Sequence, residues 1–182
     1  VDTALLTFEE QVNTFNIYSQ EIGWRPADSL FVIFMGINVS QILSFTNPAL
    51  KLYTRQDIGL PILRNEPSDP TLQTKILRSY TNLVGHLFAQ AGARNFLIIS
   101  IPPLHRSPII RLMNANEVER FRATASTFNI GLIEIANDLR HAEGANVFYY
   151  DSNDLFQSVS GGKIVRGGGG KLTRRYRRAP DT

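Results

Sequence analysis

A glycine and an asparagine, Gly36 and Asn38, directly follow a run of six apolar residues, Leu30 to Met35. An apolar run of this length that ends abruptly in polar residues is typical of a buried parallel strand. Open α/β sheets bind their ligands at the carboxyl ends of such strands. The stretch therefore predicts both an architecture and a site. A strand followed by a turn and the start of a helix would give the same pattern without any function.

Few other residue types in the chain have the spacing that catalysis or metal binding needs. The sequence has no cysteine, which excludes disulfides, thiolate metal sites and cysteine nucleophiles. Its three histidines, His86, His105 and His141, are too far apart in the sequence to form a ligand motif. Asp151 and Asp154 suggest either a metal site or a helix cap, and we favour the cap because Asp151 follows a predicted strand. We expect no metal and no cofactor.

Single residues offer weaker alternatives. Ser40 follows the first predicted strand, but no nucleophile motif surrounds it. Asn38-Val39-Ser40 is a glycosylation sequon, whose use would conflict with a role for Asn38 in a buried site. His105 lies in a proline-rich loop, where it either approaches a site or is simply exposed, and we favour exposure. We assign structural roles to His86, inside a predicted helix, and to His141, at a helix end.

Helical and strand patterns alternate along the chain. Apolar residues at helical spacing predict three helices, over Thr7 to Ile22, from Pro70-Thr71 to Gly92, and over Asn116 to His141. Thr7 with Glu10 resembles a capping box in the first helix. One face of the second helix is predicted to be buried, with Leu72, Ile76, Tyr80, Leu83, Val84 and Leu87. Short apolar runs predict three strands, Leu30 to Met35, Asn95 to Ile101 and Asn146 to Tyr150, with a short helix beginning near Leu155. Val39 to Phe45 is expected to form a helical turn and Tyr53 to Pro70 an irregular loop. This alternation predicts an α/β fold with a parallel sheet.

The composition fits one globular domain followed by a basic tail. The chain has 182 residues, of which 43% are hydrophobic, and no apolar run approaches the length of a membrane span. The tail from Ser160 to Thr182 holds seven of the 19 lysines and arginines and six of the 13 glycines. Without the tail, the body has 12 basic and 15 acidic residues. We expect the tail to be disordered, and we do not expect nucleic-acid binding, because the tail has one aromatic residue and no folded platform.

Several stretches, taken in order, resemble the GDSL-type, or SGNH, esterases and lipases. Leu30 to Asn38 resembles the third conserved block of that family. Its residues are similar to those of a fungal secreted branch that includes carbohydrate acetylesterases. The second predicted strand with Pro102-Pro103-Leu104, and the third with Asp151, are similar to the segments that follow in the same branch. The resemblance covers about Val1 to Val159. It implies a three-layer α/β/α, flavodoxin-like fold.

The resemblance also implies ester hydrolysis and specific roles for two residues. In the family a serine attacks the ester carbonyl, a histidine accepts the serine proton, and an aspartate three residues before the histidine orients it. By resemblance Asn38 is the oxyanion-hole donor, because its amide donates hydrogen bonds without carrying charge. Gly36 is assigned to substrate binding. The implied substrate is a small ester or an acetylated carbohydrate, and the implied location is extracellular.

The family's catalytic residues have no counterpart in this sequence. No Gly-Asp-Ser precedes Gly36, and no histidine follows His141. We therefore expect a partial hydrolase domain over residues 1–159, truncated and inactive as this chain, and a separate tail over residues 160–182. The alternative is a non-catalytic remnant or binding module. If the nucleophile strand is missing, the strand that ends near Gly36 should have an uncovered edge.

Overall fold

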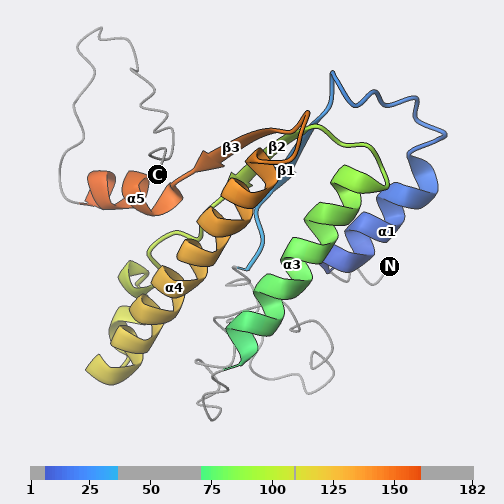
Figure 1. Ribbon diagram of the computed structural model, residues 1–182. Coiled ribbons are helices and arrows are strands. Elements are labelled where there is room, and N and C mark those ends of the chain that lie inside the picture. The colour runs from blue at the N-terminus through green and yellow to red at the C-terminus, as the bar shows by residue number, and fades with distance from the viewer. Residues whose placement is uncertain (1–6, 37–70, 109, 161–182) are drawn as a thin grey trace, which may run out of the picture.

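The computed structural model describes residues 7–36, 71–108 and 110–160. These residues form three parallel strands and four α-helices (Figure 1). The order along the chain is α1 (Phe8–Tyr18), β1 (Leu30–Ile33), α3 (Leu72–Ala89), β2 (Asn95–Ile99), α4 (Ala115–Arg140), β3 (Asn146–Tyr150) and α5 (Ser152–Ser160). Two short 3-10 helices, η3 (Leu104–Arg106) and η4 (Ile110–Leu112), lie between β2 and α4. The predicted α/β class is confirmed.

The sheet has the order β1-β2-β3, and both strand pairs are parallel. Parallel neighbours need a crossover connection, and the chain from β2 to β3 supplies one through α4. In the register, Phe31 lies beside Phe96, which lies beside Val147. The next pair on this face is Ile33 with Ile98, followed by Tyr149. Because side chains alternate along a strand, these six residues share one face of the sheet.

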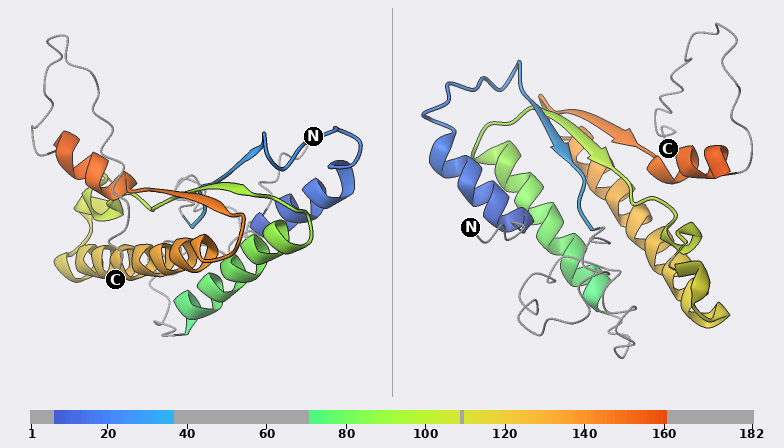
Figure 2. Two further views of the ribbon diagram at one scale, coloured as in Figure 1. Left: turned by 45° about the horizontal axis from the view of Figure 1, so that its top comes forward. Right: turned by 180° about the vertical axis from the view of Figure 1, so that it is seen from behind.

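The three long helices α1, α3 and α4 cover that face of the sheet, and the hydrophobic core lies between (Figure 2). Phe96, Ile98 and Phe128 are fully buried there. An aromatic cluster joins α1 to β1, with Phe15, Trp24 and Phe31 in edge-to-face contact at centroid distances of 5.1 to 5.6 Å. Such pairs contribute beyond their buried area, by about 0.5–1.5 kcal/mol each.

The opposite face of the sheet is exposed in the described part of the chain. Val32 is 57% exposed and Phe148 is 50% exposed, and both belong to the face turned away from α3 and α4. The expectation that Leu30 to Met35 is buried is therefore wrong for its alternate residues. A second helical layer is not among the described residues. β1 lies at the edge of the described sheet, as expected for a strand without its outer neighbour.

The helix boundaries follow local capping chemistry. The Thr7 side chain accepts a hydrogen bond from the Glu10 backbone, and the Glu10 carboxylate accepts one from the Thr7 backbone. This is the predicted capping box. The helix ends at Tyr18, before the predicted end, and Ile22 is exposed. Asn114 and Glu117 form a second capping box, which was not predicted, at the start of α4.

Several predictions fall outside the described residues. These are the helical turn over Val39 to Phe45, the loop over Tyr53 to Pro70 and the basic tail beyond Ser160.

The helix opening at Pro70-Thr71 is confirmed as α3, which buries Ile76, Tyr80, Val84 and Leu87. None of the helices that the structure describes is both long and apolar enough to cross a membrane.

Candidate functional site

The carboxyl edge of the sheet brings together three chain segments. They are Met35-Gly36 after β1, Ser100-Ile101 after β2 and Asp151-Ser152 after β3. Parallel strands deliver such segments to one edge, as the sequence analysis predicted. Asn38 and Ser40 lie outside the described residues, so the assignment of Asn38 as an oxyanion donor remains a prediction. So does a substrate-binding role for Gly36.

Gly36 is held in a conformation and a space that only glycine fits. Its φ is +100°, in the range that side-chain-bearing residues rarely adopt. A Cβ atom on Gly36 would lie 2.9 Å from Cε1 of Phe128 and 3.1 Å from Cδ1 of Ile101. The two contacts come from α4 and from the chain after β2. The glycine of the Gly-x-Asn pattern is thus fixed by tertiary packing two residues before Asn38.

Asn129, next to Phe128 on α4, fixes the chain after β2. Its side-chain amide donates to the Ile101 carbonyl at 2.9 Å, and its side-chain oxygen accepts from the Ile101 N–H at 2.8 Å. This pair replaces the backbone partner that Ile101 loses where β2 ends. Adjacent residues of one helix therefore hold the ends of β1 and β2. An asparagine inside a long helix is unfavourable, and this was the sequence signal that could have identified Asn129 as a functional residue.

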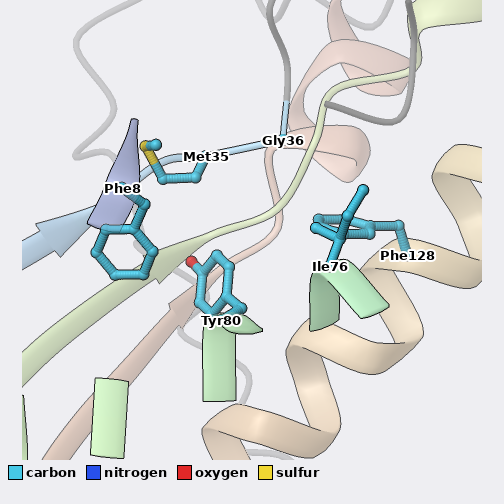
Figure 3. A pocket seen from close by; sticks show the side chains of 6 residues that line it. All are labelled: Phe8, Met35, Gly36, Ile76, Tyr80 and Phe128. Atoms are coloured by element: carbon cyan, nitrogen blue, oxygen red, sulfur yellow. The ribbon is translucent and has the colours of Figure 1, made fainter. Parts of the chain in front are cut away.

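A small apolar pocket lies between Gly36 and the helices (Figure 3). It encloses about 210 Å³ including space open to solvent, and it is lined by Phe8, Met35, Gly36, Ile76, Tyr80 and Phe128. Tyr80 is 3% exposed, and its hydroxyl has no hydrogen bond partner among the described residues. Burial, followed by the nearby Tyr149, raises the pKa of the Tyr80 hydroxyl well above its usual value. Helical spacing places Tyr80 on the buried face of α3 but indicates no role for its hydroxyl.

The other end of the edge carries a fully bonded polar cluster. The Ser152 N–H donates to the Ser100 hydroxyl oxygen at 2.9 Å, and the Ser152 hydroxyl donates to the Ser100 carbonyl. Ser100 Oγ also lies 3.3 Å from an Asp151 carboxylate oxygen. The same oxygen of Asp151 accepts from the Asp154 N–H at 3.0 Å. The interpretation of Asp151 as a helix cap is confirmed.

The three histidines do not meet at this edge. His86 lies in α3 with its Nε2 2.8 Å from the Asn16 side-chain nitrogen, and His141 is the C-cap of α4. His105 is half-buried in η3 rather than exposed, because η3 packs against α4. Its Nδ1 is buried without a partner among the described residues. Burial, followed by the charges of Arg106 and Arg122, lowers the pKa of His105, and Glu119 opposes them.

The described residues contain no group of three histidine, aspartate or glutamate side chains that could hold a metal ion. Within them, the edge of the sheet offers a constrained glycine, an apolar pocket with one hydroxyl, and a bonded serine–aspartate cluster. This arrangement can bind a small, mainly apolar group. Among the described residues, this edge of the sheet contains no nucleophile that is activated by a base.

Comparisons with known proteins match nearly the whole chain. The family model for GDSL-like Lipase/Acylhydrolase matches residues 4–166. A thermolabile hemolysin from Vibrio parahaemolyticus is 23% identical over 158 residues, which cover 86% of this chain and 31% of the hemolysin. An acetylesterase from Thermothelomyces thermophilus is 28% identical over 102 residues, which cover 56% of this chain and 27% of the acetylesterase. The matched region spans less than a third of either relative.

Proposed function

We propose, from the premise that this chain belongs to the GDSL-like lipase/acylhydrolase family, that it forms the central part of an ester hydrolase. In this proposal the Asn38 amide donates to the oxyanion, and Gly36 lines the substrate site. The observation that carries the proposal is the constrained Gly36 at the carboxyl end of β1. A rigid backbone there supports an amide donor two residues later, because oxyanion stabilisation depends on a donor that is already in position.

The proposed substrate is a small carboxylic ester or an acetylated carbohydrate. Support comes from the relative named acetylesterase and from the small size of the apolar pocket beside Gly36. We further propose an extracellular location, on the resemblance to secreted family members described above. No cofactor enters the proposed reaction, since a serine, a histidine and an aspartate suffice for acyl transfer.

The proposed reaction needs residues that the 182-residue sequence does not contain. No Gly-Asp-Ser occurs in it. Its one Asp-x-x-His, Asp138 to His141, lies at the end of α4 and not after the third strand, where the family has its pair. By itself this chain is therefore expected to give no triad-dependent turnover. The alternative proposal is a non-catalytic remnant or binding module, which shares the same lineage without the reaction.

Assays of the 182-residue chain and of an extended product distinguish the hydrolase proposal from the non-catalytic alternative. Sequencing the transcript on both sides of this reading frame would reveal any adjoining Gly-Asp-Ser and Asp-x-x-His. We expect the product that includes them to hydrolyse p-nitrophenyl acetate, and Asn38→Ala to lower its rate by roughly 10²–10³-fold. An extended product without turnover would favour the non-catalytic alternative. Turnover by the 182-residue chain that Asn38→Ala abolishes would contradict the need for outside residues.

A further inference from the structure

The Tyr80 hydroxyl, like His105 Nδ1, is a buried polar group without a partner among the described residues. It is buried on α3, and no described residue accepts or donates a hydrogen bond to it. Figure 3 shows the hydroxyl directed from α3 toward Phe8 and Met35, inside the pocket. A buried polar group without a partner is unfavourable, and native proteins retain few of them. A phenylalanine at this position would keep the ring packing on Phe8, at 5.2 Å between centroids, without that cost.

The pocket around this hydroxyl suits one kind of ligand. Its other lining side chains are Phe8, Met35, Ile76 and Phe128, which offer apolar contact only. The space within has room for roughly one water molecule or one methyl group, and part of the pocket is open to solvent. A water molecule would be poorly held there, because it needs two to four polar partners. A methyl group would fill the space, and an oxygen acceptor bonded beside it, as in an acetyl group, would satisfy the hydroxyl.

We propose that this pocket binds the acyl group of a short-chain ester, with the Tyr80 hydroxyl donating a hydrogen bond to an ester oxygen and Ile76 limiting the acyl length. The inference rests on the proposed function, because Gly36 lines this pocket and also precedes Asn38. It adds a selectivity for acetyl over longer acyl groups. It also assigns Tyr80 a binding role that the sequence alone does not indicate.

The inference can be tested by binding, without catalysis. Methyl acetate and methyl hexanoate are titrated into the full 182-residue chain while amide NMR signals of Gly36 and Tyr80 are followed. We expect saturable shifts with methyl acetate, at concentrations on the order of millimolar for so small a ligand, and at least about tenfold weaker binding of methyl hexanoate. No saturable binding of methyl acetate, or equal binding of both esters, would overturn the inference.

Two variants assign the roles of the residues. Tyr80→Phe keeps the ring and removes the donor, so methyl acetate should bind roughly three- to tenfold more weakly, the effect of one hydrogen bond. The same change should raise the melting temperature of the ligand-free protein, because it removes an unpaired buried group. Ile76→Val should reduce the preference for the shorter ester. Tyr18→Phe, at an exposed position on α1, is the matched control and should change none of these values.

The outcomes distinguish this inference from the proposed function. Unchanged methyl acetate binding in Tyr80→Phe, or a lower melting temperature, would show that the hydroxyl serves the fold, and would overturn the role of Tyr80. Neither result would affect the turnover expected of the extended protein. Conversely, an inactive extended protein that still binds methyl acetate with the predicted selectivity would contradict the hydrolase proposal and leave the acyl pocket intact.

Discussion

The two ends of the carboxyl edge of the sheet differ in whether their buried hydroxyl groups have hydrogen bond partners. Beside β3, the hydroxyls of Ser100 and Ser152 are buried and bonded to each other's backbone. Beside β1, the Tyr80 hydroxyl is buried with no partner among the described residues, against an apolar pocket. A bonded cluster stabilises the fold and has no capacity left for a ligand. An unbonded donor costs stability and is therefore the better indication of binding.

Gly36 has the largest predicted effect at the pocket end. Gly36→Ala places a Cβ 2.9 Å from the Phe128 ring in a residue with φ of +100°, so packing and backbone strain add. We expect a loss of about 2–4 kcal/mol in the free energy of unfolding, measured by urea denaturation. Gly85→Ala in α3 is the control. A Cβ there meets nothing within 4 Å, and helix propensity predicts a gain of about 1 kcal/mol.

A comparable loss in the free energy of unfolding of Gly36→Ala and Gly85→Ala would contradict this explanation. It would show that Gly36 is no more constrained than an ordinary helical glycine. The segment that precedes Asn38 would then lack the rigidity on which the oxyanion proposal depends.

The bonded end should respond to loss of its central hydroxyl. Ser100→Ala leaves the buried Ser152 N–H without its acceptor, which should cost about 1–3 kcal/mol in the free energy of unfolding. Ser126→Ala, at an exposed position on α4, should change it by less than about 0.5 kcal/mol. If Ser100→Ala were neutral, the two ends would not differ in the way described.

Asn129 tests the link between the two ends. Asn129→Ala removes both side-chain hydrogen bonds to the Ile101 backbone at the end of β2. We expect a loss of about 1–2 kcal/mol and faster amide hydrogen exchange at Ile101. Exchange at Phe96, inside the sheet, is the internal control. Unchanged protection of Ile101 would mean that another group holds the end of β2.

His105 should have the smallest effect, and the effect depends on pH. Its pKa in the folded protein is lowered, mainly by burial, so the unfolded chain binds a proton more readily. The corresponding stability is present above pH 6.5, the usual histidine value, and is lost as pH falls through the lower folded pKa. Replacing His105 with glutamine should therefore reduce the drop in melting temperature between pH 7.5 and 5. A drop of the same size in the variant would exclude His105 as its source.

The sequence by itself determined the elements and their order. Thr7 with Glu10 predicted the start of α1, and the apolar spacing of Ile76, Tyr80 and Val84 predicted the buried face of α3. Asp151 after a strand predicted the cap of α5. These features depend on neighbours within a few residues, so local chemistry suffices to predict them. The family resemblance is likewise carried by the order of the segments.

Only the tertiary structure decided which of these residues meet. Phe128 and Ile101 enclose Gly36 from segments 65 or more positions further along the chain, and no periodicity in the sequence encodes that contact. The same holds for the Tyr80 hydroxyl, whose lack of a partner depends on Phe8, Met35 and Phe128 together. The exposed face of the sheet also escaped prediction, because an apolar run such as Leu30 to Met35 is the same whether one face or both are covered. A strand's composition indicates what it can bury, whereas packing decides what it does bury.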